Sequence, residues 1–268
     1  MQTRAIAKTD SAFLVSDRDE YRSFWDWYET DGWEPETVAI FDRFLRPDMR
    51  YVDLGAWIGS TVLLAAPRVS RVVCAEPDPL AFAVLTENLL LNPETEEKTV
   101  AVQAAVGPGD GTVTLSSAGR GGDSNSSVVR RGDTGAHWEA EQVSLSTLLS
   151  RAGVEAADFV KIDIEGAEYD LVPAMRNRVS TLYIAFHPNL LIDKRSFPAR
   201  VTSSVRALLA NRRLLRKLLQ YRHHYVFDDR TRTFRDIRRR NVLRVLFPLP
   251  LRSSFLIGAC VFTNEHHG

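Results

Sequence analysis

Cysteine is scarce in this chain, whose 268 residues include only Cys74 and Cys260. Two cysteines cannot build the dense disulfide framework of a small secreted domain. Both lie in apolar stretches, VVCAE and IGACVF, that are typical of buried, reduced thiols, and no Cys or His spacing indicates a zinc site. The sequence therefore favours a reducing compartment.

Long apolar runs and flexible linkers are also missing. No run approaches the roughly 18 apolar residues of a membrane span, and the N-terminal MQTRAIAKTDSAFLV has neither the apolar core nor the cleavage site of a signal peptide. We therefore expect a cytoplasmic protein with no transmembrane segment. Because no Gly/Ser/Pro-rich linker divides the middle of a chain that is 44% hydrophobic, one large α/β domain is favoured over two small ones.

Neither sign of charge dominates, yet the two signs are separated along the chain. Residues 1–193 hold 17 Lys/Arg and 30 Asp/Glu, a net charge of −13, whereas residues 194–252 hold 17 and 3, a net charge of +14. Two interpretations of this basic region stay open. It is either a solvated face that neutralises the acidic body, or a surface for an anionic partner: a membrane with peripheral attachment, a nucleotide-linked sugar or a carrier protein. Nucleic acid is disfavoured, because the aromatic–basic interleaving of RNA modules is missing.

Apolar patterns predict strands that alternate with helices, which is typical of βαβ units and a mostly parallel sheet. Predicted strands cover 51–54, 71–76, 99–107, 157–166, 180–188, 223–234 and 253–264. Predicted helices cover 18–46 with a break at Pro35, 60–66, 79–92, 167–175 and 199–221. We expect 111–117 to form a hairpin with the strand at 99–107, and 118–135 to be a loop. The aromatic side chains of 18–46 either pack internally or wall a substrate pocket, and the paired histidines at 223–224 and 266–267 are interpreted as surface residues.

The end of the first predicted strand reads D-L-G-A-W-I-G, with Asp53, Gly55 and Gly59. Its G-x-x-x-G spacing is not the G-x-G-x-x-G of dinucleotide dehydrogenases, and the G-K-[ST] element of phosphate-binding loops is missing. Glu76 ends the next strand, 21 positions after Gly55, where an acid can accept both hydroxyls of a ribose. Together the loop and the acid predict a nucleoside-type cofactor and disfavour an NAD-dependent oxidoreductase.

The stretch DFVKIDIEGAEYDL, residues 158–171, ends a buried strand in several acids. Asp163 and Glu165 are two residues apart and share one face while the strand lasts. After the turn at Gly166, Glu168 and Asp170 are expected to be ordinary residues of a helix start, where acids suit the helix dipole. Asp163 and Glu165 are therefore the candidates for binding or catalysis.

Taken in order, these segments resemble one family. YVDLGAWIGS, VVCAEPDPLAFAVLTENLLLN, QAAVG and VSLSTLLSRAGVEAADFVKIDIEGAEYDLV are similar to the FkbM family of S-adenosylmethionine-dependent methyltransferases, over residues 33–190. The resemblance implies a Rossmann-like class I methyltransferase fold, an α/β fold with a seven-stranded, mostly parallel sheet, an antiparallel last strand and helices on both faces. Residues 47–268 would form the methyltransferase domain with its basic helical part 194–252, and residues 1–46 a helical, aromatic segment that can cap the acceptor.

The resemblance also implies roles for individual residues. Glu76 would hold the ribose, and Asp163 would face the cofactor and the acceptor. The methionine end of the cofactor would be lined by Asp53, Gly55, Ala56 and Gly59. The adenine would lie near Gln103 and Ala104. Family members mostly methylate hydroxyls on sugars, polyketides and related molecules, so the implied activity is O-methylation of a hydroxyl on a sugar, glycolipid or polyketide-type natural product.

The catalytic group stays open among Asp163, Glu165 and His187, each of which could act as the general base. His187 is included because the fifth strand reads YIAFHPN, where the family leads us to expect an acid. Alternatively, Asp163 and Glu165 hold a divalent metal ion such as Mg²⁺, which prefers oxygen ligands. The departure at YIAFHPN also leaves an alternative function, a non-catalytic nucleoside-binding or scaffold protein with the same fold.

Overall fold

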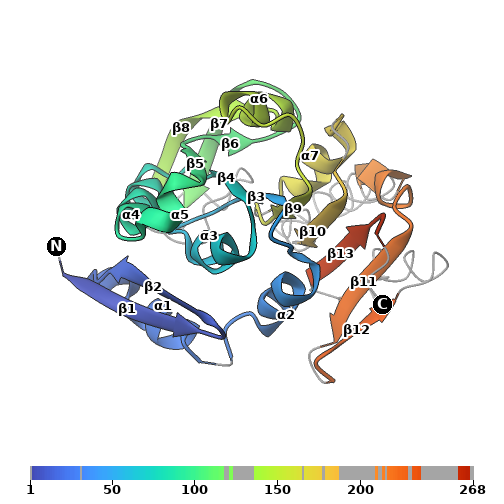
Figure 1. Ribbon diagram of the computed structural model, residues 1–268. Helices are drawn as coiled ribbons and strands as arrows, with labels where there is room; N and C mark the ends of the chain where they lie inside the picture. The colour runs from blue at the N-terminus through green and yellow to red at the C-terminus, as the bar shows by residue number, and fades with distance from the viewer. Residues whose placement is uncertain are drawn as a thin grey trace, which may run out of the picture.

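The computed structural model describes residues 2–30, 32–117, 121–122, 136–164, 166–176, 179–186, 209–210, 213–214, 216–228, 231–236 and 259–265. Its centre is a mixed sheet of eight strands with helices on both faces (Figure 1). In chain order these strands are β3 (Arg50–Leu54), β4 (Arg71–Ala75), β5 (Thr99–Val102), β9 (Phe159–Ile162), β10 (Thr181–Ala185), β11 (His223–Asp228), β12 (Thr233–Asp236) and β13 (Ala259–Thr263).

Five of these strands are parallel and lie in the spatial order β5-β4-β3-β9-β10. β13 then pairs antiparallel with β10, β11 with β13, and β12 with β11. The predicted Rossmann-like sheet with an antiparallel last strand is therefore confirmed. An eighth strand joins the seven because the segment predicted as one strand at 223–234 folds as the hairpin β11–β12, with Arg232 in the left-handed region (φ 53°) at its turn.

The strand order reverses beside β3. The chain runs outward from β3 to β4 and β5, and then returns to β9 on the other side of β3. Open α/β sheets bind ligands outside the carboxyl ends of their strands at such a switch point. Since the three predicted motifs follow β3, β4 and β9, all of them reach this edge of the sheet.

Side chains alternate between the two faces, as the period of a strand requires. Tyr51 and Phe159 belong to the core on one face, and Val52 and Val160 to the core on the other. The first core is covered by the N-terminal residues, α1 (Asp19–Tyr28), α2 (Pro35–Phe44), α3 (Ser60–Ala65) and α4 (Pro79–Leu90). The second core is covered by α6 (Leu145–Arg151) and α7 (Glu168–Ala174). Two further helices are short: the 3₁₀ helix η1 (Ala66–Arg68) and α5 (Pro93–Glu97).

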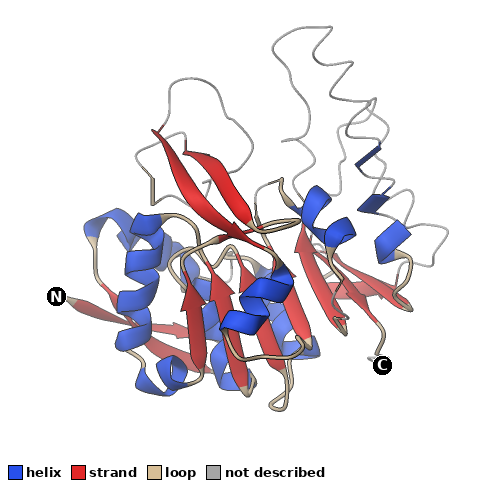
Figure 2. Ribbon diagram, turned by 90° about the horizontal axis from the view of Figure 1, so that it is seen from above, coloured by secondary structure: helices blue, strands red, loops and turns tan. Residues whose placement is uncertain are grey.

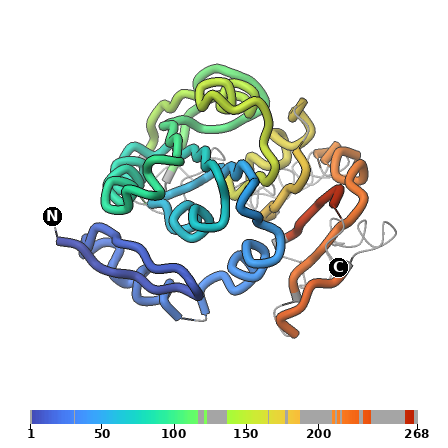
Figure 3. Tube along the Cα trace, viewed as in Figure 1, coloured from blue at the N-terminus to red at the C-terminus, as the bar shows by residue number. Residues whose placement is uncertain are grey.

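The chain begins with a hairpin that the sequence did not predict. β1 (Thr3–Lys8) pairs antiparallel with β2 (Ser11–Ser16), and both bury alternate side chains. A 2.8 Å hydrogen bond from the Ser16 N–H to Asn88 Oδ1 fixes the hairpin to α4. Helices α1 and α2 then follow as predicted, with Pro35 as the first residue of α2. In the view of Figure 3 the blue trace of this segment lies below α3 and leads into α2.

A second, three-stranded sheet contains β6 (Ala105–Val106), β8 (Ala136–Val143) and β7 (Gly111–Ser117), in that spatial order. The strand predicted at 99–107 is divided between the two sheets, because the chain turns after Val102, whose carbonyl accepts a 3.0 Å hydrogen bond from the Ala104 N–H. The predicted hairpin of 111–117 with 99–107 is wrong: β7 pairs antiparallel with β8. Figure 2 shows the long strands of this sheet from above.

Three smaller expectations are decided by burial. Cys74 and Cys260 are free and buried, as predicted. His224 is also buried, with its Nε2 3.3 Å from the Leu218 carbonyl, so its interpretation as a surface residue is wrong. Glu168 and Asp170 lie in the first turn of α7, as predicted, although Glu168 is buried and its Oε2 accepts the Gly166 N–H at 2.7 Å.

Within the described parts of the chain, no helix combines the length and the apolar character needed to cross a membrane. Most of the basic region 194–252, including most of the helix predicted at 199–221, lies outside the described residues.

Candidate active site

The loop after β3 depends on two glycines in the left-handed region, Gly55 (φ 85°) and Gly59 (φ 89°). A Cβ on Gly55 would lie 2.0 Å from the carbonyl oxygen of Asp163, and a Cβ on Gly59 would lie 2.7 Å from the Leu85 side chain. The first glycine therefore lets the loop touch the end of β9, and the second lets it touch α4. This close packing joins the ends of β3 and β9 into one surface.

A buried lysine links the carboxylates of these two strand ends. Lys161 Nζ lies 3.2 Å from Asp163 Oδ2 and 3.6 Å from Asp53 Oδ1. Asp53 is completely buried, and its Oδ2 accepts hydrogen bonds from the Tyr51 hydroxyl (2.9 Å) and Thr61 Oγ1 (2.6 Å). Burial raises the pKa of Asp53, while Lys161 and the two hydroxyls oppose this shift. Burial alone would lower the pKa of Lys161, but the surrounding carboxylates outweigh it and raise that pKa, which keeps the ammonium charged.

Glu76 follows β4 and is buried at the same edge. Its two carboxylate oxygens accept hydrogen bonds from the backbone N–H groups of Trp57 and Asp78, both at 2.8 Å. Burial raises the pKa of Glu76 to about 7, although both of these hydrogen bonds act to lower it. Asp78 caps the next helix, because its Oδ1 accepts the Leu80 N–H of α4 at 2.8 Å.

Gly122, from the segment predicted as a loop, is fixed over this edge. Its N–H donates to Asp78 Oδ2 at 2.6 Å, and its carbonyl accepts from the Tyr21 hydroxyl (3.0 Å) and Trp57 Nε1 (2.9 Å). Gly122 therefore connects the loop after β3, the start of α4 and helix α1. The remaining residues of that predicted loop, apart from Gly121, lie outside the described residues.

The residues predicted near the adenine lie at the next strand end. Ala75 of β4 is in register with Val102 of β5, so Gln103 follows β5 beside Glu76. Gln103 is exposed and Ala104 is buried. The structure thus brings Glu76, which is predicted to hold the ribose, and the predicted adenine residues to neighbouring positions on one edge of the sheet.

A cavity of about 250 Å³ lies at the switch point between β3 and β9. One side is formed by the glycine loop and the end of β9, and the other by α1 and the turn that follows it. Its lining contains Phe24, Trp27, Trp33, Glu34, Gly55, Ala56, Trp57, Ser60, Thr61, Lys161 and Asp163. Complete ligand sites have about 300–1,000 Å³, so this cavity fits part of a large ligand.

The aromatic side chains of the N-terminal segment pack internally, and some of them also line the cavity. Trp25 is fully buried and packs edge-on against Tyr28, with ring centroids 5.2 Å apart. Phe24 packs against Trp57 of the glycine loop, with centroids 4.6 Å apart, and both line the cavity. Trp27 also lines the cavity, and 51% of its surface is exposed.

The predicted site residues are therefore placed differently. Gly55, Ala56 and Asp163 line the cavity, whereas Asp53 lies behind the lining and contacts two of its residues, Lys161 and Thr61. Gly59 starts α3, outside the cavity lining. Glu165 and His187 lie outside the described residues.

Lys161, Glu34 and Trp57 were missed as site residues. A single lysine in the apolar run FVKI was a signal, because an unpaired buried ammonium is costly and implies nearby carboxylates. Glu34 precedes Pro35 in WEP and gave no such signal, since its place in the site depends on how α1 and α2 pack on the sheet.

The magnesium hypothesis gains no support from the described part of the chain. It contains no group of three His, Cys, Asp or Glu side chains that could hold a metal ion. The carboxylate of Asp163, one of the two proposed ligands, already faces the ammonium of Lys161.

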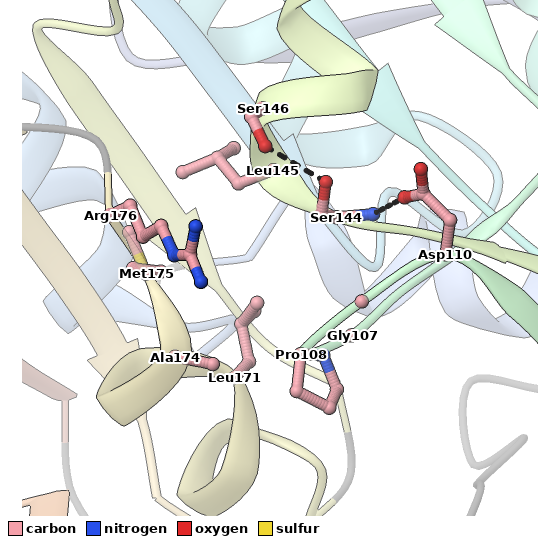
Figure 4. Close-up of a pocket in the computed structure, with 11 residues that line it drawn as sticks. Gly107, Pro108, Asp110, Ser144, Leu145, Ser146, Leu171, Ala174, Met175 and Arg176 are labelled. Carbon is pink, nitrogen blue, oxygen red and sulfur yellow. Dashed lines mark hydrogen bonds between the residues drawn. The ribbon is translucent and has the colours of Figure 1, made fainter.

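A second cavity, of about 290 Å³, lies between the start of α6 and the end of α7 (Figure 4). Asp110 in its lining accepts hydrogen bonds from the Ser144 N–H (2.7 Å) and Thr147 Oγ1 (2.8 Å), and Ser144 caps α6, while Arg176 lines the side formed by the end of α7. None of the predicted site residues lines this cavity, and we interpret it as a junction between helices.

The fold and this edge define a class of protein. A parallel sheet with one antiparallel strand inserted between β10 and β11, a glycine loop after its first strand and a ribose-type acid after the next are the features of class I S-adenosylmethionine-dependent methyltransferases. The chain belongs to the FkbM methyltransferase family: the family model described as "Methyltransferase FkbM domain" matches residues 53–227, about two-thirds of the chain. The resemblance inferred from the motifs is thereby confirmed.

Solved structures are similar at low sequence identity. The methyltransferase FkbM from Methylobacillus flagellatus KT is 16% identical, over 64% of this chain and 45% of its own, with a TM-score of 0.35. A SAM-dependent O-methyltransferase from Thermotoga maritima is 10% identical, over 85% of this chain and 64% of its own (TM-score 0.40). A precorrin-6y C5,15-methyltransferase from Geobacter metallireducens GS-15 is 11% identical, over 96% and 92% (TM-score 0.36).

This chain therefore spans less than half of the length of the M. flagellatus protein. A search of curated proteins finds no match to the sequence.

Proposed function

We propose that this protein transfers a methyl group from S-adenosylmethionine to a hydroxyl oxygen of a sugar, glycolipid or polyketide-type natural product. The observation that supports this best is the cavity at the switch point, which has the glycine loop and Asp163 on one side and aromatic side chains on the other. The cofactor supplies an electrophilic methyl group on a positively charged sulfur. A cavity with one polar and one aromatic wall suits an acceptor that carries hydroxyls on a ring or an apolar chain.

The residues at the strand ends suit this cofactor. A carboxylate has about four acceptor positions, so Glu76 can receive two ribose hydroxyls in addition to the N–H groups of Trp57 and Asp78. Gly55 and Ala56 bring the backbone to the cavity without bulky side chains. Asp163, on the same side of the cavity, would face the positive charge of the sulfonium, which it would stabilise in the bound state.

The acceptor side is formed by α1 and the turn after it. Trp27, which is half exposed, offers a flat apolar face against which a ring can pack by dispersion, and the buried Trp33 completes the wall beside it. Holding the acceptor hydroxyl in line with the methyl group supplies a large part of the rate enhancement, because an encounter of two molecules becomes a step within one complex. A general base adds about 10²–10⁴-fold.

The test has two stages. Calorimetry should show binding of S-adenosylmethionine, and S-adenosylhomocysteine formation is then measured with a panel of hydroxylated sugars, glycolipids and polyketides. We expect product with at least one hydroxyl acceptor, and mass spectrometry should locate the new methyl group on oxygen. Methylation at nitrogen or carbon alone would exclude the O-methyl assignment.

The same experiment addresses the alternative of a non-catalytic nucleoside-binding or scaffold protein. That alternative predicts cofactor binding without S-adenosylhomocysteine formation on the whole panel. Full activity in excess EDTA would exclude a required Mg²⁺ ion.

A further inference from the structure

The cavity contains an acid that the methyltransferase core does not supply. Glu34 lies in the turn between α1 and α2, outside residues 53–227 that the family model matches, and lines the cavity together with Lys161 and Asp163. We propose that Glu34 binds the acceptor hydroxyl and accepts its proton during methyl transfer, so that the N-terminal segment carries a catalytic group as well as an aromatic wall. This inference rests on the proposed function.

The backbone of Glu34 is held in a strained conformation. Its φ of 32° and ψ of 57° lie in the left-handed region, which is unfavourable for a residue with a side chain. Such conformations persist where the surrounding structure imposes them, and they cluster at active sites and ligand-binding sites. Glu34 adopts this left-handed conformation directly before α2, whose first residue is Pro35.

Two buried hydroxyls fix the carboxylate of Glu34. Thr37 Oγ1 donates to Glu34 Oε2 at 2.7 Å, and the Tyr183 hydroxyl lies 2.6 Å from the same Thr37 oxygen. Because Thr37 uses its proton toward Glu34, Tyr183 is the donor of the second hydrogen bond. Burial raises the pKa of Tyr183 well above its ordinary value, so this phenol keeps the proton that it donates. The chain of hydrogen bonds runs from β10 to α2 and orients Glu34 in the cavity wall.

Glu34 is better suited to accept a proton than Asp163, the other acid in the cavity. Asp163 Oδ2 lies 3.2 Å from the Lys161 ammonium, and a carboxylate paired with a cation is a weaker base. Burial, followed by the negative charge of Asp163, raises the pKa of Glu34 to about 7. A general base works best when its pKa is close to the working pH.

The titratable groups that face Glu34 come from several elements. Asp163 and Glu36 raise its pKa and Lys161 lowers it, while the phenols of Tyr28 and Tyr183 stay protonated because burial raises their pKa values. Glu34 therefore changes charge near neutral pH, while the Lys161 ammonium stays charged and the two phenols stay neutral.

In the proposed step, the hydroxyl proton moves to the Glu34 carboxylate while the hydroxyl oxygen forms its bond to the methyl carbon. The carbon–sulfur bond breaks, and its electron pair remains on sulfur as a neutral thioether. The proton then leaves Glu34 for water when the product departs. No further reactant is required.

The first experiment replaces Glu34 with Gln and uses Glu36→Gln as the matched control, since Glu36 lies two residues away and outside the cavity lining. With the acceptor identified for the wild type, we expect Glu34→Gln to lower kcat about 10²–10⁴-fold and to change the calorimetric Kd for S-adenosylhomocysteine less than twofold. In the wild type, kcat should rise with pH through about 7, and this rise should be missing from Glu34→Gln. Glu36→Gln should keep the rise but show it at a lower pH, because Glu36 no longer raises the pKa of Glu34. A Glu34→Gln enzyme that keeps kcat within twofold of the wild type would overturn the proposal.

The second experiment needs no acceptor. Carboxyl carbon NMR of the ¹³C-Glu-labelled protein with bound S-adenosylhomocysteine, compared with Glu34→Gln, identifies the Glu34 resonance and its titration. We expect a midpoint near 7, whereas an ordinary midpoint near 4.3 would overturn the inference and leave the methyltransferase assignment intact. Failure of the proposed function is recognised separately, by a wild-type protein that methylates no hydroxyl acceptor.

Discussion

Gly55 is a residue whose backbone and surroundings both exclude a side chain. Its φ is 85°, and a Cβ would lie 2.0 Å from the backbone carbonyl of Asp163. For Gly55→Ala we expect a loss of about 3 kcal/mol or more in the free energy of unfolding, from left-handed strain and overpacking together. Urea unfolding measures this loss. Gly109→Ala is the control, since nothing lies within 4 Å of its added Cβ, and an equal loss in both variants would contradict the argument.

Glu76 makes stability depend on pH. Its pKa rises from an ordinary 4.5 to about 7 on folding, so between these pH values the folded protein holds a proton that the unfolded chain has released. The resulting stabilisation is complete below pH 4.5 and is lost as pH rises through 7, about 3 kcal/mol in total. We expect wild-type stability in urea to fall by this amount relative to Glu76→Gln between pH 5 and pH 8. If the difference in stability between the wild type and Glu76→Gln stays constant across this pH range, the pKa of Glu76 is not raised by burial.

At the scale of residues, the sequence revealed the acids whose place follows from a local pattern. Asp163 and Glu76 each end an apolar strand, and parallel strands bring their carboxyl ends to one edge. Glu34 has no such pattern, because its position depends on long-range contacts from Thr37 to Tyr183 and from α1 to the glycine loop. The pairing of Lys161 with two strand ends is equally non-local.

Helix α1 presents two tryptophans with opposite surroundings. Trp25 is fully buried, and Trp27 is 51% exposed in the cavity wall. We expect Trp25→Ala to lower the free energy of unfolding by about 3–5 kcal/mol, because it leaves a cavity in the core. Trp27→Ala should change it by less than about 0.5 kcal/mol and should instead raise the acceptor KM several-fold. Stability by urea unfolding and KM by steady-state kinetics separate the two effects, and an unchanged KM in Trp27→Ala would remove this residue from the acceptor site.

At the scale of elements, β3, β4 and β9 were predictable, because each is an apolar run followed by Gly or an acid, whereas β5 is followed by Gln103 and is shorter than its predicted strand. The wrong predictions concern pairing between segments that are distant in the sequence. β7 has a regular strand pattern, but its partner β8 begins only at Ala136, and nothing in either strand specifies the pairing. His224 was predicted to lie on the surface but is buried. Its burial depends on the place of β11 beside β13 in the sheet, which the local sequence does not reveal.

At the scale of the whole molecule, charge is distributed as two blocks. The acidic block, residues 1–193, contains the described cavity and both of its acids, whereas the basic block, residues 194–252, holds 17 Lys/Arg against 3 Asp/Glu. An acceptor anchored in an anionic membrane would be held by the basic block while its hydroxyl reaches the cavity. On this proposal, affinity for the surface and the chemistry would belong to different parts of the chain.

If the basic block binds an anionic membrane, its arginines should contribute measurably to vesicle binding. Each Lys/Arg near an anionic surface contributes about 1 kcal/mol to binding, so replacing Arg238, Arg239 and Arg240 with Gln should weaken binding to vesicles that contain phosphatidylserine by about 100-fold. Cosedimentation at low salt measures the binding, which should fall steeply as salt rises, because screening shortens the range of the attraction. Neutral phosphatidylcholine vesicles are the control, and calorimetric binding of S-adenosylhomocysteine should be unchanged in the triple variant. If the wild type does not bind anionic vesicles even at low salt, the basic block serves a soluble anionic partner or neutralises the acidic body, and the membrane attachment is excluded.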